Sequence, residues 1–162
     1  MSLEQNKVIV LQFYEAFDRQ DIELGRKLMS VDIIARGLDT NPLQGYDVVI
    51  RYGAMMFAAF PDGRHTIDEI IAEGDKVVTR GIFAGTHQGE LMGIPPTGKQ
   101  ITFSVIHIDR LENGKIVEHW GQGDVRTLMQ QVGIVFLPSP KLIVHTLKNI
   151  LSKIGKSEQT RK

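Results

Sequence analysis

The chain has no cysteine among its 162 residues. This absence excludes disulfides, thiolate metal ligands and a cysteine nucleophile, and it suits a reducing compartment. No excess charge of either sign is present, because nineteen basic residues balance nineteen acidic ones. The apolar runs are too short to span a bilayer, and the first residues lack the basic region and cleavage site of a signal peptide. We therefore expect a cytoplasmic protein without a nucleic-acid partner.

Familiar catalytic signatures are missing as well. The sequence contains no Gly-x-Ser-x-Gly nucleophile motif, no dinucleotide fingerprint and no phosphate loop. Its five histidines do not show metal-binding spacing such as His-x-x-x-His on a helix. We expect neither a metal nor a cofactor.

Helical patterns dominate the first sixty residues. Ser2 is placed to begin a capping box, and apolar residues at helical spacing predict a first helix to about Asp18. Asp21 is a candidate cap for a second, shorter helix, and the β-rich segment 31–39 follows. Another apolar stripe predicts a third helix that stops at Pro61.

The apolar period changes to two from residue 65 onward, which indicates strands. Asn113-Gly114 between β-branched runs is a strong signal for a tight antiparallel hairpin. The expected strands cover 65–73, 76–88, 99–112 and 115–125. Helices first and long strands last predict an α+β fold in which helices cover one face of a curved antiparallel sheet.

The C-terminal segment is predicted to be separate from the main domain. We expect one domain over 1–135, a basic amphipathic helix within 138–156 and a disordered tail over 157–162. Docking of this helix on the domain or on a neighbouring subunit is favoured over binding to a membrane surface, which the same pattern also fits.

Three motifs together resemble the SnoaL-like polyketide cyclase family. They are Gly-Thr-His-x-Gly at 85–89, Gly-Ile-Pro-Pro-Thr-Gly at 93–98, and Gly-Lys-Ile-x-Glu-x-Trp at 114–120 with an aspartate four residues past the tryptophan. The resemblance implies the cone-shaped fold of the NTF2-like superfamily, with a pocket between helices and sheet. It also implies intramolecular aldol ring closure on an apolar, carbonyl-bearing small molecule without metal or cofactor. A homodimer or larger homo-oligomer that buries the outer sheet face is implied too.

The family's catalytic acid falls on Asp124. Simple alternation along the last strand predicts that Trp120, Gln122 and Asp124 share the concave face, as an aromatic wall, an amide and a carboxyl. Desolvation there would raise the pKa of Asp124 and suit it for acid/base work near neutral pH. The alternative is that Asp124 caps the helix that follows it.

The histidines receive different predictions. His107 is in register with the apolar residues of its strand and is a second candidate catalytic group, although a buried core histidine is an equal alternative. His119 is expected on the opposite face from Asp124, at an interface or on the surface. His87 is expected to order the Pro-Pro turn, and His65 carries no functional signal.

Side chains from the helices are candidates for the rest of the pocket wall. For each of them, simple packing in the core is favoured, and a role in substrate binding is the alternative. The substrate-binding candidates on the helices are Tyr14, Tyr52, Met56 and Phe60.

Acid/base cyclisation, or related lyase or isomerase chemistry, is the first functional hypothesis. A non-catalytic module that binds a small molecule or a protein is the second, since this scaffold hosts many functions. Hydrolysis or dehydration in the same pocket is the third. The sequence does not identify the substrate.

Overall fold

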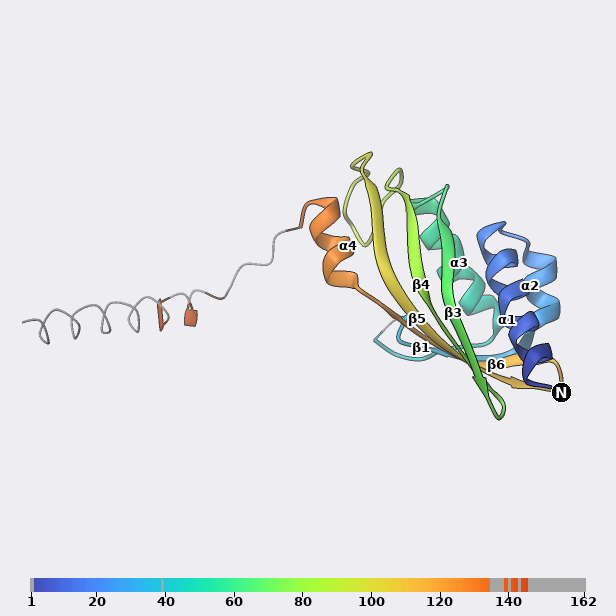
Figure 1. The fold of residues 1–162 in the computed structure, drawn as a ribbon. Coiled ribbons are helices and arrows are strands. Elements are labelled where there is room, and N and C mark those ends of the chain that lie inside the picture. Colours follow the sequence, from blue (N-terminus) through green and yellow to red (C-terminus); the bar gives the residue numbers. More distant parts are fainter. Residues whose placement is uncertain (1, 39, 135–138, 140, 143, 146–162) are drawn as a thin grey trace, which may run out of the picture.

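The computed structural model describes residues 2–38, 40–134, 139, 141–142 and 144–145. Helices α1 to α3 precede the long strands, and a short helix α4 follows them (Figure 1). The helices are α1 (Leu3–Asp18), α2 (Ile22–Leu28), α3 (Tyr46–Ala59) and α4 (Val125–Val132). The strands are β1 (Met29–Arg36), β2 (Leu43–Gln44), β3 (Arg64–Glu73), β4 (Lys76–Thr86), β5 (Gln100–Glu112) and β6 (Lys115–Gly123). These bounds confirm the predicted elements to within a few residues.

The six strands form one curved sheet in the order β2-β1-β6-β5-β4-β3. Strands β3 to β6 pair antiparallel with their sequence neighbours, which confirms the predicted meander. Strand β1 instead pairs parallel to β6, and this was not predicted. Pairing between segments so far apart in the chain leaves no local turn signal in the sequence.

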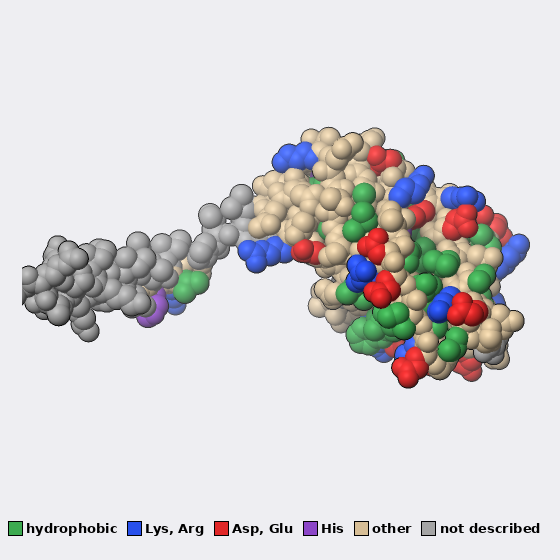
Figure 2. All heavy atoms as spheres, in the orientation of Figure 1, with side chains coloured by type: hydrophobic (Ala, Val, Ile, Leu, Met, Phe, Trp, Pro, Cys, Tyr) green, Lys and Arg blue, Asp and Glu red, His purple; other side chains and the backbone are tan. Residues whose placement is uncertain are grey.

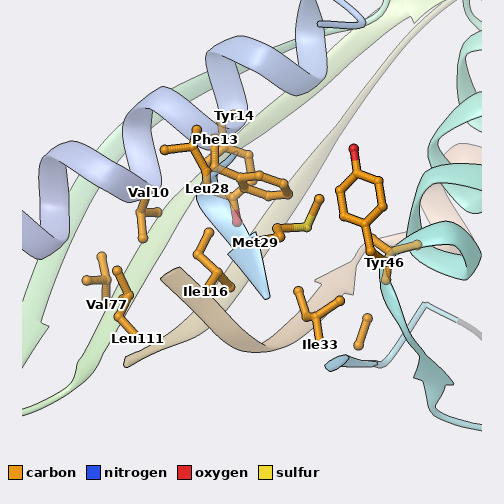
Figure 3. Packing of buried hydrophobic residues seen from close by; sticks show 12 residues of the cluster. Val10, Phe13, Tyr14, Leu28, Met29, Ile33, Tyr46, Val77, Leu111 and Ile116 are labelled. Carbon is orange, nitrogen blue, oxygen red and sulfur yellow. The ribbon is translucent and has the colours of Figure 1, made fainter. Parts of the chain in front are cut away.

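Helices α1, α2 and α3 cover one face of the sheet, and among the described residues no helix packs on the other face (Figure 1). The sheet bends around them, so the predicted α+β cone is confirmed. Apolar side chains fill its interior in two clusters. The first packs α1 and α2 against β1 and β6 around Val10, Met29 and Ile116 (Figure 3). The second lies toward α4, around Phe60, Phe83 and Phe103.

Local signals in the sequence account for the ends of several elements. The Ser2 hydroxyl accepts from the backbone N–H of Gln5, whose side chain accepts from that of Ser2, so the predicted capping box is confirmed. Asp21 caps α2 through the backbone N–H of Leu24. Asn113 and Gly114 both have positive φ, at 51° and 78°, as the hairpin turn requires.

A bulge near the start of β6 changes which side chains face the interior. Arg110 pairs with Glu118 and Leu111 pairs with Ile116, so β6 has one more residue than β5 at this point. One extra residue inverts the alternation of faces. Ile116 and His119 are consequently both buried although they are three positions apart, an odd spacing that simple alternation would place on opposite faces.

The predicted C-terminal helix within 138–156 lies mostly outside the described residues, and the predicted disordered tail lies wholly outside them. Residues 141–142 and 144–145 are helical. In the part of the chain that the structure describes, no helix is long and apolar enough to cross a membrane.

Candidate active site

A cavity lies between the two hydrophobic clusters, under the helices and on the concave face of the sheet. It encloses about 150 Å³. Most of its wall is aromatic or aliphatic, and the side chains with polar atoms that interrupt this wall are two tyrosines, three histidines and a glutamine. They are Tyr14, Tyr52, His65, His107, His119 and Gln122. An apolar pocket with few convergent polar groups is the usual form of a small-molecule site.

Asp109 is the buried acid of this site. It lies directly opposite His119 in the β5–β6 ladder, and its side chain is fully buried. Its Oδ1 is 2.8 Å from Nδ1 of His119, and its Oδ2 accepts a hydrogen bond of 3.0 Å from the Tyr14 hydroxyl. Because the carboxylate occupies Nδ1, His119 is left with Nε2 as the nitrogen for a ligand.

Tyr14 supports this pair from helix α1. Burial first, and then the charge of Asp109, raise the pKa of the Tyr14 hydroxyl well above its ordinary value. The hydroxyl therefore keeps its proton and donates a hydrogen bond to the carboxylate. Tyr14 and His119 together satisfy both oxygens of Asp109, as a buried carboxylate requires.

His107 is the unsatisfied polar group of the cavity. Both of its ring nitrogens are buried, and neither has a hydrogen-bond partner among the described residues. Burial, followed by the neighbouring His119 and His65, lowers the pKa of His107 to about 2. His107 is therefore neutral near pH 7, with one N–H to donate and one lone pair to accept.

Gly121 creates the space that His107 and His119 share. It lies opposite His107 in the ladder. A Cβ at this position would be 3.2 Å from Nε2 of His119, 3.4 Å from Nδ1 of His107 and 2.6 Å from Cδ2 of Leu38. A side chain here would occupy the place where a ligand atom can approach both imidazoles.

Three of the predicted helix residues lie at the cavity wall. Tyr14, Tyr52 and Met56 all line it, although their contact with a substrate stays a prediction. Phe60 does not line it. Its side chain is fully buried in the second cluster, against Phe83 and His87, so the structure supports the favoured alternative of core packing for Phe60 and not its candidate role in substrate binding.

The β6 bulge overturns the predicted face of Trp120. Trp120 is 49% exposed on the outer side of the sheet and does not line the cavity. Its indole donates to Glu118, and the Arg36 guanidinium lies over its ring. Gln122 borders the cavity, but its side chain is exposed. The expected inward tryptophan is therefore wrong, whereas contact of Gln122 with a substrate stays a prediction.

The predicted setting of Asp124 is also wrong. Its side chain is fully exposed and caps α4, accepting from the backbone N–H of Thr127 at 2.9 Å and from its hydroxyl. These two hydrogen bonds, the hydroxyl's first, lower the pKa of Asp124 where the pocket hypothesis required a raised one. Asp124 does not line the cavity. The alternative reading, a helix cap, is the one the structure supports.

Other site residues escaped the sequence analysis. Asp109 is two residues from His107 on the same buried face of β5, so strand periodicity alone could have identified it. His119 was assigned to the wrong face because of the bulge. His65 lies on β3 beside a carboxylate from α1, a contact with no local sequence signal. Within 2–38 and 40–134, no three acidic or histidine side chains are arranged to hold a metal ion.

The chain matches one protein family and two characterised relatives. The family model described as SnoaL-like polyketide cyclase matches residues 8–132. Aklanonic acid methyl ester cyclase DnrD of Streptomyces peucetius is 27% identical over 129 residues, which are 77% of this chain and 88% of that protein. Nogalonic acid methyl ester cyclase of Streptomyces nogalater is 33% identical over a shorter match of 52 residues, which span 32% of this chain and 39% of that protein.

Solved structures agree. IdmH of Streptomyces antibioticus, a candidate polyketide cyclase, superposes with a TM-score of 0.72 at 31% identity, covering 80% of this chain and 99% of IdmH. AclR of Streptomyces galilaeus, a candidate hydroxylase, gives 0.75 at 30% identity, covering 83% of this chain and all of AclR. With its cone fold, its cavity and a family match across nearly all of the folded domain, the chain belongs to the SnoaL-like polyketide cyclase family.

Proposed function

We propose that this protein is an ester cyclase that closes a carbon ring by intramolecular aldol addition, using His119 and Asp109 for proton transfer. The observation that carries the proposal is the buried Tyr14–Asp109–His119 set at the wall of an apolar cavity. A simple binding pocket has no need of a buried carboxylate that fixes one nitrogen of an imidazole.

Proton removal begins the reaction. Nε2 of His119 takes the proton from a carbon next to a substrate carbonyl, and the electron pair of that C–H bond forms an enolate. Asp109 holds Nδ1–H and balances the imidazolium charge that develops, while Tyr14 holds Asp109 in place. This is the same division of work as in other carboxylate–imidazole pairs.

His107 acts on the enolate oxygen as a neutral hydrogen-bond donor. No hydrogen bond within the described residues has to break before the N–H of His107 can donate to this oxygen, because neither ring nitrogen has a partner there. The enolate carbon then forms the new C–C bond with a second carbonyl of the same molecule, whose oxygen becomes an alkoxide and takes up a proton. The product has the formula of the substrate, so protein groups alone can complete the reaction.

The size of the cavity bears on the substrate. A space of about 150 Å³ is comparable to engineered protein cavities that hold benzene. The ring under closure fits inside, and the rest of a larger flat molecule extends past Tyr52 and Met92, which line the cavity and are not fully buried. An apolar, carbonyl-bearing polyketide ester is the ligand class that matches this wall.

A second copy of the chain is the proposed partner of the outer sheet face. Hydrophobic side chains gather between charged ones on this face (Figure 2), and Ile82, Ile106, Ile108 and Trp120 are all more than a third exposed. Glu118 accepts from both Arg36 and Arg110 beside them. An apolar centre with an ordered arginine and tryptophan is typical of interfaces.

Conversion of a polyketide ester tests the proposal. The full chain is incubated with aklanonic acid methyl ester and with nogalonic acid methyl ester, and the products are analysed by liquid chromatography and mass spectrometry. We expect a product of unchanged mass and new retention time from at least one ester. Tight binding without conversion of either ester would favour the non-catalytic module, and a product that has lost water would favour dehydration.

A further inference from the structure

A second carboxylate–imidazole pair faces the same cavity from the opposite side. Asp18 is the last residue of α1, and His65 is the second residue of β3. Oδ1 of Asp18 is 2.7 Å from Nδ1 of His65, and Oδ2 accepts the backbone N–H of His65 at 2.7 Å. The two side chains are only 11% and 9% exposed. The contact between Oδ1 and Nδ1 repeats that of Asp109 and His119, whereas the second oxygen has a backbone partner in place of the Tyr14 hydroxyl.

His107 stands between the two pairs. Its ring centre is 5.8 Å from that of His65 and 5.2 Å from that of His119. His65 lines the cavity, and Tyr14 lies 5.3 Å from it by ring centre. Because Asp18 occupies Nδ1, the nitrogen of His65 that is left for a ligand is Nε2, as in His119.

The contact of Asp18 with His65 also ties α1 to β3, and this role must be separated from chemistry. The backbone N–H of His65 already makes that tie to Oδ2 of Asp18. The additional bond to Nδ1 fixes the tautomer and the orientation of the ring. A ring fixed in this way and lining a cavity is arranged as a proton-transfer group.

We propose that His65, oriented by Asp18, is a second proton-transfer residue that acts on a different substrate atom from His119. The proposal rests on the ring closure described above. Such a closure needs one proton removed from carbon and one delivered to the carbonyl oxygen under attack. His119 takes the first, and His65, entering as the imidazolium beside the Asp18 carboxylate, gives the second from Nε2 as the C–C bond forms. Solvent then takes a proton from His119 and returns one to His65.

Separating the two proton transfers tests this assignment. Aklanonic acid methyl ester is incubated in D₂O with the full chain, and deuterium exchange at carbon is followed beside ring closure. Asparagine at 65 can place an amide N–H where Nδ1 lies and keep the bond to Asp18, but it cannot transfer a proton. We expect His65→Asn to retain exchange within about threefold while closure falls at least about a hundredfold. Closure within about threefold of the native rate, or equal loss of both reactions in a folded variant, would overturn the proposal.

Asp18 is a positioning residue, and its variant gives a second, independent comparison of ring closure with deuterium exchange. Asp18→Asn removes the charge that balances the His65 imidazolium, so closure should fall by at least about tenfold while exchange persists. A purely structural tie predicts lower melting temperatures with closure and exchange reduced together. His145→Gln is the matched histidine control, since His145 is exposed and does not line the cavity.

A general-base probe keeps the proposal testable if neither ester reacts. In the Kemp elimination of 5-nitrobenzisoxazole, a base removes the ring C–H proton, its electron pair forms the nitrile, and the N–O bond breaks to release a coloured phenolate. At about pH 9, where an ordinary imidazole is neutral and can act as a base, we expect His119→Asn to retain a rate at least about tenfold above that of the His65→Asn/His119→Asn double variant. Equal rates for the two would refute a proton-transfer role for His65, whereas a retained rate with both esters inert would refute only the proposed substrate class.

Discussion

His107→Phe should change how the stability of the fold depends on pH. The native imidazole is buried, and its pKa is lowered to about 2 from an ordinary 6.5. The groups that face it are Tyr14 from α1, His65 from β3, Thr79 from β4, and His119 with Gly121 from β6. Phenylalanine fills a similar volume and has no group to protonate.

The sign follows from comparing the folded and unfolded chains. As the pH falls below about 6.5, the unfolded chain protonates His107 and the folded chain does not. Acidification therefore favours unfolding, by up to about 1.4 kcal/mol for each pH unit between the two pKa values. From pH 7 to pH 5 the loss amounts to about 2 kcal/mol, and His107→Phe should escape it. A loss of that size is a large part of the 5–15 kcal/mol typical of a domain.

Urea denaturation at pH 7, 6 and 5 measures this effect. The stability of the variant relative to the native chain should rise by about 2 kcal/mol over this range. His145→Gln, at an exposed position, should track the native chain throughout. A difference between His107→Phe and the native chain that stays constant within about 0.5 kcal/mol would show that His107 is not held neutral by the fold.

Three further predictions follow from the geometry. Asp109→Asn should lower kcat by about a hundred- to ten-thousandfold, because the amide favours the wrong His119 tautomer. The tautomer is measured by ¹⁵N NMR, and an unchanged kcat would contradict this prediction. Gly121→Ala should abolish ligand binding, seen by calorimetry, with little loss of fold; undiminished affinity would show that ligands do not reach Nε2 of His119. The native chain should be a dimer in light scattering and Ile108→Glu a monomer, whereas a native monomer would refute the proposed interface.

Much of the fold could be predicted because its signals are local. The capping box at Ser2, the Asp21 cap and the Asn113-Gly114 turn each depend on residues within a few positions of one another. Alternation along β5 also placed His107 on the buried face. The parallel pairing of β1 with β6 joins distant segments, and it carries no such signal.

The candidate site was less predictable, and one local irregularity explains most of the error. Without the β6 bulge, alternation would bring Trp120 inward and His119 outward, which is the opposite of what the structure has. The predicted placement of Asp124 in the pocket is wrong because the strand ends at Gly123, so the carboxyl turns to cap α4. Asp18 and His65 meet only after α1 has packed across β3, so their contact depends on tertiary structure alone.

His119, and not Asp124, is the residue that we propose takes the proton from carbon. The most direct measurement compares kcat for aklanonic acid methyl ester in His119→Asn and Asp124→Asn. Asparagine at 119 can keep the bond to Asp109 but cannot accept a proton, and asparagine at 124 caps a helix about as well as aspartate. We predict that His119→Asn lowers kcat at least about a hundredfold, while Asp124→Asn stays within about threefold of the native chain. The reverse result, with Asp124→Asn inactive and His119→Asn active, would contradict the account.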